Sequence, residues 1–144
     1  MEILLKPIGV IHSPFTEKMG IPVQPFHSEE TGWVEVHKEF ERGLRDIEGF
    51  SHIILFHFHP GEETYLEIKP FLDTRTHGIF ATRDLTRPNH LGFSVVKLLE
   101  RNGNILKVRE IDVIEGTLLL DIKPYVPRFD SRIDCRIGWL EGRV

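Results

Sequence analysis

Residues 51–59 read SHIILFHFH, and this stretch decides the fold because both of its faces are apolar along most of its length. A strand with two apolar faces is buried on both sides, so the stretch predicts a central strand. Period-two alternation places His52 and Phe56 on one face, with His57 and His59 on the other. The rest of the sheet is expected to assemble around this strand.

Shorter stretches on both sides predict the neighbouring strands. Strands are expected at residues 3–11 with a break at Pro7, and at 33–37, 78–81, 93–99, 105–111 and 118–123, with a further short strand at 65–69. Residues 40–47 predict a short helix or helical turn, and residues 16–32 predict a turn-rich loop. About eight strands and one or two short helices indicate a mainly-β fold: a single domain over residues 1–144, built as a closed or nearly closed, mostly antiparallel β-barrel.

The composition is that of a globular protein with an uneven charge distribution. The 144 residues carry 18 Lys and Arg against 22 Asp and Glu, a net charge of −4. Residues 1–70 hold 6 basic and 12 acidic side chains, whereas residues 71–144 hold 12 basic and 10 acidic ones. The acidic balance argues against a general nucleic-acid binder, but the second half could present a local basic face to a phosphate or carboxylate.

Location is predicted from cysteine content and apolar runs. The single cysteine, Cys135, excludes an internal disulfide, which predicts a reducing, cytoplasmic location. The opening residues lack a signal-peptide pattern, because Glu2 and then Lys6-Pro7 interrupt the apolar run. Apolar runs such as residues 53–56 are far too short to span a bilayer, so no membrane association is expected.

Residues 78–92, GIFATRDLTRPNHLG, change from a short apolar strand to a polar loop that contains two arginines. Arg83 and Arg87 each offer a planar fork of donors suited to a carboxylate or a phosphate. Pro88 fixes its own φ and holds Arg87 toward an extended conformation, which suits the reception of an anion. The alternative is a surface loop with two solvated arginines.

Two histidines on one strand face suggest a metal site as one interpretation. His57 and His59 could ligate iron, manganese or zinc if Glu63 or His77 supplied a third ligand. The alternative is that one histidine packs in the core and the other ends the strand. The sequence has no glycine-rich nucleotide fingerprint, and no serine, Ser94 included, has the context of a catalytic triad.

Residues 121–125, DIKPY, end the last expected strand. Alternation places Asp121 and Lys123 on one face, where they can form an ion pair. Pro124 bends the chain and presents Tyr125 from the strand end. The stretch is interpreted either as an ion pair beside a packed tyrosine or as part of a site.

Taken together, these motifs resemble those of one family. The matching stretches, in chain order, are residues 8–15 (IGVIHSPF), 49–52 (GFSH), 78–83 (GIFATR) with 87–89 (RPN), 115–117 (EGT) and 121–125 (DIKPY). The chain resembles the TsaA-like or TrmO-like proteins over residues 7–130. It departs from their pattern at Asp84, Leu85, His90 and Leu118.

The resemblance implies an S-adenosylmethionine-dependent methyltransferase built on a β-barrel. The activity characterised in that family is N-methylation of threonylcarbamoyladenosine beside the anticodon of threonine tRNA. The resemblance also implies a homodimer with pockets near the subunit interface. Two functions of other classes stay open from the sequence: a metal-dependent barrel enzyme using His57 and His59, and a non-catalytic S-adenosylmethionine-binding module.

The resemblance also implies roles for individual residues and a reaction that needs no metal. Cofactor contacts would come from the motif residues Ser13, Pro14, Phe15, Ser51, His52, Glu115, Gly116, Thr117 and Leu118. Arg83 or Arg87 would bind the methionine carboxylate or an RNA phosphate. Asn89 and Lys123 would contact the substrate. Asp121 and Tyr125 would orient the acceptor or take its proton, since catalysis rests on positioning donor and acceptor in line.

Overall fold

The computed structural model describes residues 1–16 and 28–144, so most of the turn-rich loop expected at 16–32 lies outside the described residues. Contacts along the chain divide it into two compact units. The barrel unit comprises Met1–His59 and Leu91–Tyr125, and the smaller unit comprises Pro60–His90 and Val126–Val144. The expected single domain over the whole chain stays a prediction.

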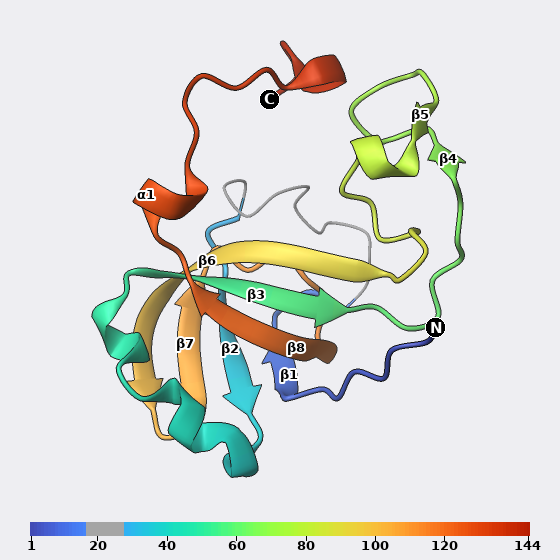
Figure 1. The fold of residues 1–144 in the computed structure, drawn as a ribbon. Coiled ribbons are helices and arrows are strands. Elements are labelled where there is room, and N and C mark those ends of the chain that lie inside the picture. Colours follow the sequence, from blue (N-terminus) through green and yellow to red (C-terminus); the bar gives the residue numbers. More distant parts are fainter. Residues whose placement is uncertain (17–27) are drawn as a thin grey trace. The chain divides into compact units, whose positions relative to one another are not determined.

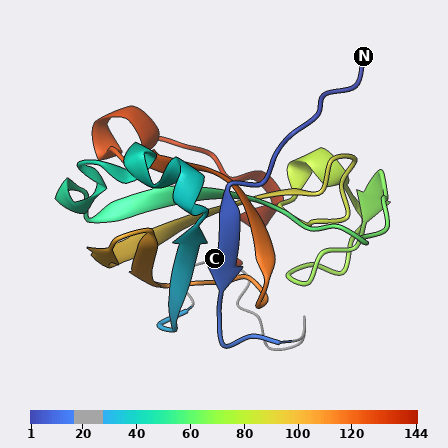
Figure 2. The same ribbon diagram turned by 90° about the horizontal axis from the view of Figure 1, so that it is seen from below.

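The barrel unit is a closed barrel of antiparallel strands, which confirms the predicted fold class. Its strands are β1 (Gly9–His12), β2 (Thr31–Val36), β3 (His52–Phe58), β6 (Leu91–Asn102), β7 (Ile105–Arg109) and β8 (Thr117–Pro124). The order around the barrel is β1-β2-β7-β6-β3-β8 (Figures 1 and 2). β3 pairs with β6 on one side and β8 on the other, so the stretch at 51–59 is the central strand that its apolar faces predict.

Apolar side chains from alternating strand positions fill the barrel. Ile11, Ile53 and Leu119 have no exposed surface. Each contributes about 1.5–3 kcal/mol by leaving water. Gly9 allows β1 to approach β2, because a Cβ on Gly9 would overlap the carbonyl oxygen of Glu35. Barrel closure also pairs both edges of the sheet, which protects it from association with other strands.

Two expectations about local structure are wrong. Residues 3–5 are exposed and precede β1, because Pro7 lacks the backbone donor that a strand needs. Residues 79–81 form a 3-10 turn instead of a strand, because the Thr82 amide and hydroxyl both donate to the carbonyl of Ile79. The helical segment expected at 40–47 is confirmed as the 3-10 helices η2 (Lys38–Leu44) and η3 (Ile47–Gly49), which Asp46 separates with a φ of 73°.

The smaller unit contains short elements. These are the paired strands β4 (Glu67–Ile68) and β5 (His77–Gly78), the 3-10 helices η4 (Ile79–Ala81) and η5 (Gly138–Leu140), and the α-helix α1 (Pro127–Asp130). β4 confirms the short strand expected at 65–69. The described residues hold more helical turns than the one or two expected, but each is short. None of the described helices has the length and apolar character needed to cross a bilayer.

The barrel has two ends, and both carry residues that the sequence singles out. At the Ser13 end, β1, β3 and β7 finish while β2, β6 and β8 begin. At the Tyr125 end, the directions are reversed, and Tyr125 follows the last residue of β8. Because β8 has 8 residues, its two ends lie roughly 20 Å apart.

Candidate functional site

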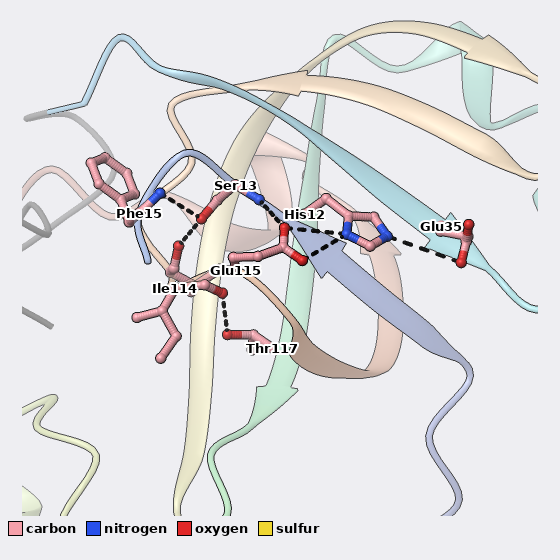
Figure 3. Close-up of polar contacts among 8 residues, drawn as sticks. His12, Ser13, Phe15, Glu35, Ile114, Glu115 and Thr117 are labelled. Atoms are coloured by element: carbon pink, nitrogen blue, oxygen red, sulfur yellow. Dashed lines mark hydrogen bonds and ion pairs between the residues drawn. The ribbon is translucent and has the colours of Figure 1, made fainter. Parts of the chain in front are cut away.

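The loop after β1 is tied to the segment before β8 by hydrogen bonds at the Ser13 end (Figure 3). The Glu115 carboxylate accepts a hydrogen bond from the Ser13 amide at 3.1 Å and lies 2.9 Å from His12 Nδ1. Figure 3 shows the His12 ring between Glu115 and Glu35, and the Glu35 carboxylate is 4.0 Å from His12 Nε2. Two acidic groups therefore flank one imidazole.

The hydroxyls of this junction are engaged within the protein. Ser13 Oγ donates to the carbonyl of Val113 at 2.5 Å and accepts from the Phe15 amide at 3.2 Å. Thr117 Oγ1 donates to the carbonyl of Ile114 at 2.7 Å. Both hydroxyl protons are thus already used, so Ser13 and Thr117 position the two loops.

Backbone hydrogen bonds complete the junction and leave one turn accessible. The Glu115 amide donates to the Phe15 carbonyl at 2.6 Å, and the Gly116 amide donates to the Ile11 carbonyl at 3.0 Å. Gly116 has a φ of 85°, which favours glycine, and a side chain there would meet no atom within 4 Å. The backbone at Gly116 can therefore be approached closely by another molecule.

The junction unites most of the residues expected to bind a cofactor. The loop after β1 supplies Ser13, Pro14 and Phe15. The segment before β8 supplies Glu115 and Gly116, and β8 begins with Thr117 and Leu118. Stretches about 100 residues apart in sequence meet here because β1 and β8 are neighbours in the barrel. Their binding of a cofactor stays a prediction.

A second group, at the Tyr125 end, comprises Ser51, His52 and Tyr125. Ser51 Oγ lies 2.8 Å from His52 Nδ1, and the Tyr125 amide donates to the His52 carbonyl at 3.1 Å. The two rings meet edge to face with centroids 6.4 Å apart. Ser51 and His52 therefore do not join Ser13 within one barrel, although the resemblance implies that all three serve one cofactor.

Asp121 and Lys123 are both exposed on β8. No ion pair joins them in the described part of the chain, so the pair expected from alternation does not form. The Asp121 carboxylate instead accepts a hydrogen bond from the Ile122 amide at 2.8 Å. Asp121 pairs through its backbone with Phe56 of β3, which places its carboxylate nearer the middle of the strand than Tyr125.

The arginine loop, residues 82–90, belongs to the smaller unit. Arg87 Nη1 donates to the carbonyl of Thr82 at 2.9 Å and to that of Asp84 at 3.1 Å. Part of the Arg87 fork therefore stabilises its own loop. Arg83 is exposed, whereas Arg87 is half-buried. The two arginines of the loop therefore differ in exposure.

Two positions that depart from the family pattern hold this loop together. Asp84 Oδ1 accepts hydrogen bonds from the Thr86 amide at 3.0 Å and hydroxyl at 2.7 Å. His90 has a φ of 51°, in the left-handed region, and its Nδ1 lies 3.0 Å from the carbonyl of Leu85. Asn89 is exposed beside it. The departures are therefore part of the loop's own hydrogen bonding.

Sequence reasoning missed a chain of buried polar side chains in the barrel unit. His59 Nε2 lies 2.5 Å from His57 Nδ1, His57 Nε2 lies 2.9 Å from Ser94 Oγ, and Ser94 donates to Asp112 Oδ1 at 2.6 Å. Because the serine proton goes to Asp112, His57 Nε2–H donates to Ser94, and His57 Nδ1 accepts from His59. The same direction excludes activation of Ser94 by His57.

Space for this chain comes from Gly92, the cross-strand partner of His57. A Cβ on Gly92 would overlap the His57 ring and lie 3.1 Å from His59 Nε2. Burial, with the charge of His59 as a second cause, lowers the pKa of His57 to about 3, so this ring is neutral at neutral pH. Gly92 and the paired histidines were visible in the sequence, but no local spacing connects them to Asp112.

The described residues do not provide the ligand set that a metal-dependent enzyme using His57 and His59 would need. Within the described residues, no three His, Cys, Asp or Glu side chains come together in an arrangement that could hold a metal ion. His57 and His59 instead bond to each other.

Known proteins show clear similarity to this chain. The family model of the tRNA-methyltransferase O N-terminal domain matches residues 10–131. A probable S-adenosyl-L-methionine-binding protein of Pyrococcus abyssi is 54% identical over 144 residues, which cover 99% of this chain and 78% of the relative. The tRNA (adenine(37)-N6)-methyltransferase of Rattus norvegicus is 37% identical over 138 residues, which cover 90% of this chain and 32% of the rat protein.

Solved structures show the same relationship. The crystal structure of TrmO from Pseudomonas aeruginosa matches with a TM-score of 0.81 and 37% sequence identity, covering 96% of this chain and 62% of that one. This chain therefore spans less than two thirds of the bacterial structure and a smaller share of the rat enzyme. Because the family model covers most of its length, the chain belongs to the tRNA-methyltransferase O N-terminal domain family.

Proposed function

We propose that this protein is an S-adenosylmethionine-dependent methyltransferase that acts on N6 of adenine 37 in tRNA. The observation that carries the proposal is the junction at the Ser13 end, where the family's first motif closes onto the segment before β8. Relatives named as an S-adenosyl-L-methionine-binding protein and as tRNA methyltransferases support it. Following the resemblance, the acceptor is threonylcarbamoyladenosine of a threonine tRNA, and the reaction takes place in the cytoplasm.

The junction fits a donor of this kind. S-adenosylmethionine carries a sulfonium and an ammonium group, and Glu115, with 42% of its side chain exposed, offers a carboxylate to a cation. The accessible turn at Gly116 lets backbone groups approach the adenosine part. When bound, the donor supplies an electrophilic methyl group. Ser13 and Thr117 hold the two loops that would flank it.

The remaining work of the protein is to orient the acceptor and to remove a proton. Positioning of two reactants in line accounts for much of such a rate enhancement. The acceptor amine loses its proton at or after the attack, and we assign orientation or proton removal to Asp121 and Tyr125. Tyr125 is held against the His52 ring, and the exposed carboxylate of Asp121 is accessible to an incoming base. Lys123 and Asn89, both exposed, would contact the RNA.

Transfer of label from S-adenosylmethionine to tRNA that lacks this modification tests the function. Nucleoside analysis should find the label in methylated threonylcarbamoyladenosine. Donor binding by calorimetry without label in any nucleoside would identify a non-catalytic binding module instead. Asp121→Asn and Tyr125→Phe should each lower turnover without weakening donor binding, and the exposed Glu100→Gln serves as the control. Full turnover in both variants would refute their assigned roles.

The separation of the two groups supports a homodimer. Glu115 precedes β8 and Tyr125 follows it, so the two residues lie at opposite ends of one barrel. A two-fold dimer could join the Ser13 end of one copy to the Tyr125 end of its partner. Glu115→Gln and Tyr125→Phe should each have lowered activity alone. An equal mixture that is reassociated at random should then rise to about a quarter of wild-type activity, because half of the dimers are mixed and each mixed dimer holds one intact site. A mixture whose activity did not rise would show that each copy holds a complete site.

A further inference from the structure

A short repeat follows the last strand of the barrel. Residues 128–139 read RFDS, RIDC and RIGW, three tetrads that each begin with an arginine and continue with a large apolar residue. The arginines are Arg128, Arg132 and Arg136, and the apolar residues are Phe129, Ile133 and Ile137. Basic side chains combined with an aromatic one, here Phe129, are the groups that proteins use to bind single-stranded nucleic acid. Residues 128–137 are called the RNA-binding strip below.

Every residue of the strip is exposed. Phe129 has 70% and Ile133 has 92% of its surface open to solvent, so both apolar side chains are accessible to a ligand. Among the described residues, the side chains of Arg128 and Arg136 have no hydrogen-bond or ion-pair partner. Arg132 uses one nitrogen, Nη1, to donate to two backbone carbonyls, which steadies the strip. Three guanidinium groups are therefore presented with donors available to a ligand.

The beginning of the strip is held in a helical turn by local hydrogen bonds. α1 starts with Pro127, whose fixed φ suits a first helical position. The Asp130 carboxylate accepts a hydrogen bond from the Val126 amide at 2.8 Å, so one of the acidic groups of the strip is used inside it. The chain then leaves the helix and runs as an irregular trace to η5 (Figure 1).

The end of the strip is anchored more firmly. The Trp139 ring stacks on His77 with centroids 4.6 Å apart and an angle of 17°, and its Nε1–H donates to the carbonyl of Ala81 at 2.8 Å. Arg143 donates to the carbonyl of Trp139 at 2.7 Å and to Asp73 at 3.3 Å. Asp73 also lies 2.7 Å from His77 Nε2. These contacts attach the strip to the segment that immediately precedes the arginine loop.

We propose that the RNA-binding strip holds the tRNA substrate, with its arginines on phosphates and with Phe129 and Ile133 against unstacked bases; this rests on the proposed function. Guanidinium forks match phosphate geometry, and single-stranded loops are the part of RNA whose bases can pack on such side chains. Because the strip begins as a helical turn and its end is attached through Trp139, less conformational entropy is lost on binding than for a free tail.

The first test removes the three charges of the strip. Arg128→Gln, Arg132→Gln and Arg136→Gln are combined in the full-length chain, and binding of a fluorescently labelled anticodon stem–loop is followed by anisotropy at several salt concentrations. Three lost phosphate contacts should reduce the slope of log K against log salt by about 2 and weaken binding by about 100-fold at 0.1 M salt. The matched control removes three exposed cations around η2, with Lys38→Gln, Arg42→Gln and Arg45→Gln.

The second test keeps the charges and removes the apolar groups. Phe129→Ala with Ile133→Ala should weaken binding about tenfold and leave the salt slope unchanged, because base packing releases no counterions. Circular dichroism and donor affinity should match the wild type in all variants. In the methyl-transfer assay, the triple arginine variant should raise KM for tRNA and keep kcat at saturating tRNA.

The outcomes separate the strip from the proposed function. If the wild-type protein methylates tRNA but the triple arginine variant keeps the wild-type salt slope and KM, RNA binding by the strip is refuted. The proposed methyltransferase function is then unaffected. An equal loss of affinity in the control around η2 would also refute RNA binding by the strip, because only total charge would then matter. A wild-type protein that binds the donor but no RNA would overturn both. Altered self-association with unaltered RNA binding would assign the strip to a contact between copies.

Discussion

Replacement of Gly92 with alanine should destabilise the barrel by about 3 kcal/mol, although alanine normally suits a strand better than glycine. The new methyl group would overlap the His57 ring, and forcing extra volume into a packed core costs about 1–3 kcal/mol. Displacement of that ring would break a buried hydrogen bond to Ser94 or His59, for about 1–3 kcal/mol more. The better strand propensity of alanine returns only about 0.5–1 kcal/mol.

Urea unfolding followed by circular dichroism measures this change as a shift in midpoint at constant slope. Thermal unfolding should move in parallel, by about 3 °C for each kcal/mol in a chain of this length. Gly43→Ala is the matched control, because a side chain at Gly43 would meet no atom within 4 Å. That variant should be unchanged or stabilised by up to about 1 kcal/mol.

The proposed cause can be refuted with a double mutant. His57→Ala removes the ring that Gly92→Ala would strike, so in that background the second substitution should cost less than about 1 kcal/mol. An equal cost of Gly92→Ala in both backgrounds would show that the overlap with His57 is not the reason. A cost below about 1 kcal/mol in the wild-type background would show that the His57 ring moves aside at little energetic cost.

Three further predictions concern pH and one side-chain hydroxyl. Burial lowers the pKa of His57 to about 3, so the unfolded state binds more protons than the folded state between pH 6.5 and 3. The free energy of unfolding should therefore fall as the pH is lowered through that window. His57→Gln should reduce the slope of this free energy against pH by the equivalent of one proton. A hydrogen bond from His77 is the main cause that lowers the pKa of Asp73 to about 2, so its contribution is complete above about pH 4 and is lost toward pH 2. In Asp73→Asn, the free energy of unfolding measured with urea should depend less on pH between about pH 4 and pH 2. Ser13→Ala removes the hydrogen bond to the Val113 carbonyl and should lower the free energy of unfolding by about 1–2 kcal/mol. Ser131→Ala, at an exposed position, should change it by less than about 0.5 kcal/mol.

The barrel strands were predictable because the signal for a strand is local. Side chains along a strand alternate between its two faces, and the doubly apolar stretch at 51–59 therefore predicted a central strand. Errors occurred where another local interaction competes with the apolar pattern. At residues 79–81, Thr82 closes a turn on the carbonyl of Ile79, and apolar content alone does not report that bond.

The candidate site was predictable in membership but not in arrangement. Motif resemblance named both Ser13 and Ser51 as cofactor residues, yet barrel connectivity places them at opposite ends. Only the structure shows that Arg87 is half-buried and donates to its own loop backbone, whereas Arg83 is exposed. The positions of Ser13 and Ser51 follow from strand order, and the bonds of Arg87 follow from the loop conformation. Neither can be read from the spacing of these residues along the chain.

By itself, the sequence determined most of the segments that become strands, that no internal disulfide forms, and which family the motifs resemble. Only the tertiary structure decided that Glu115 closes onto Ser13, and that His57, Ser94 and Asp112 form one directed chain. The physical reason is closure of the barrel. Pairing β1 with β8, and β3 with β6, sets contacts between distant residues, and these depend on the register of whole strands.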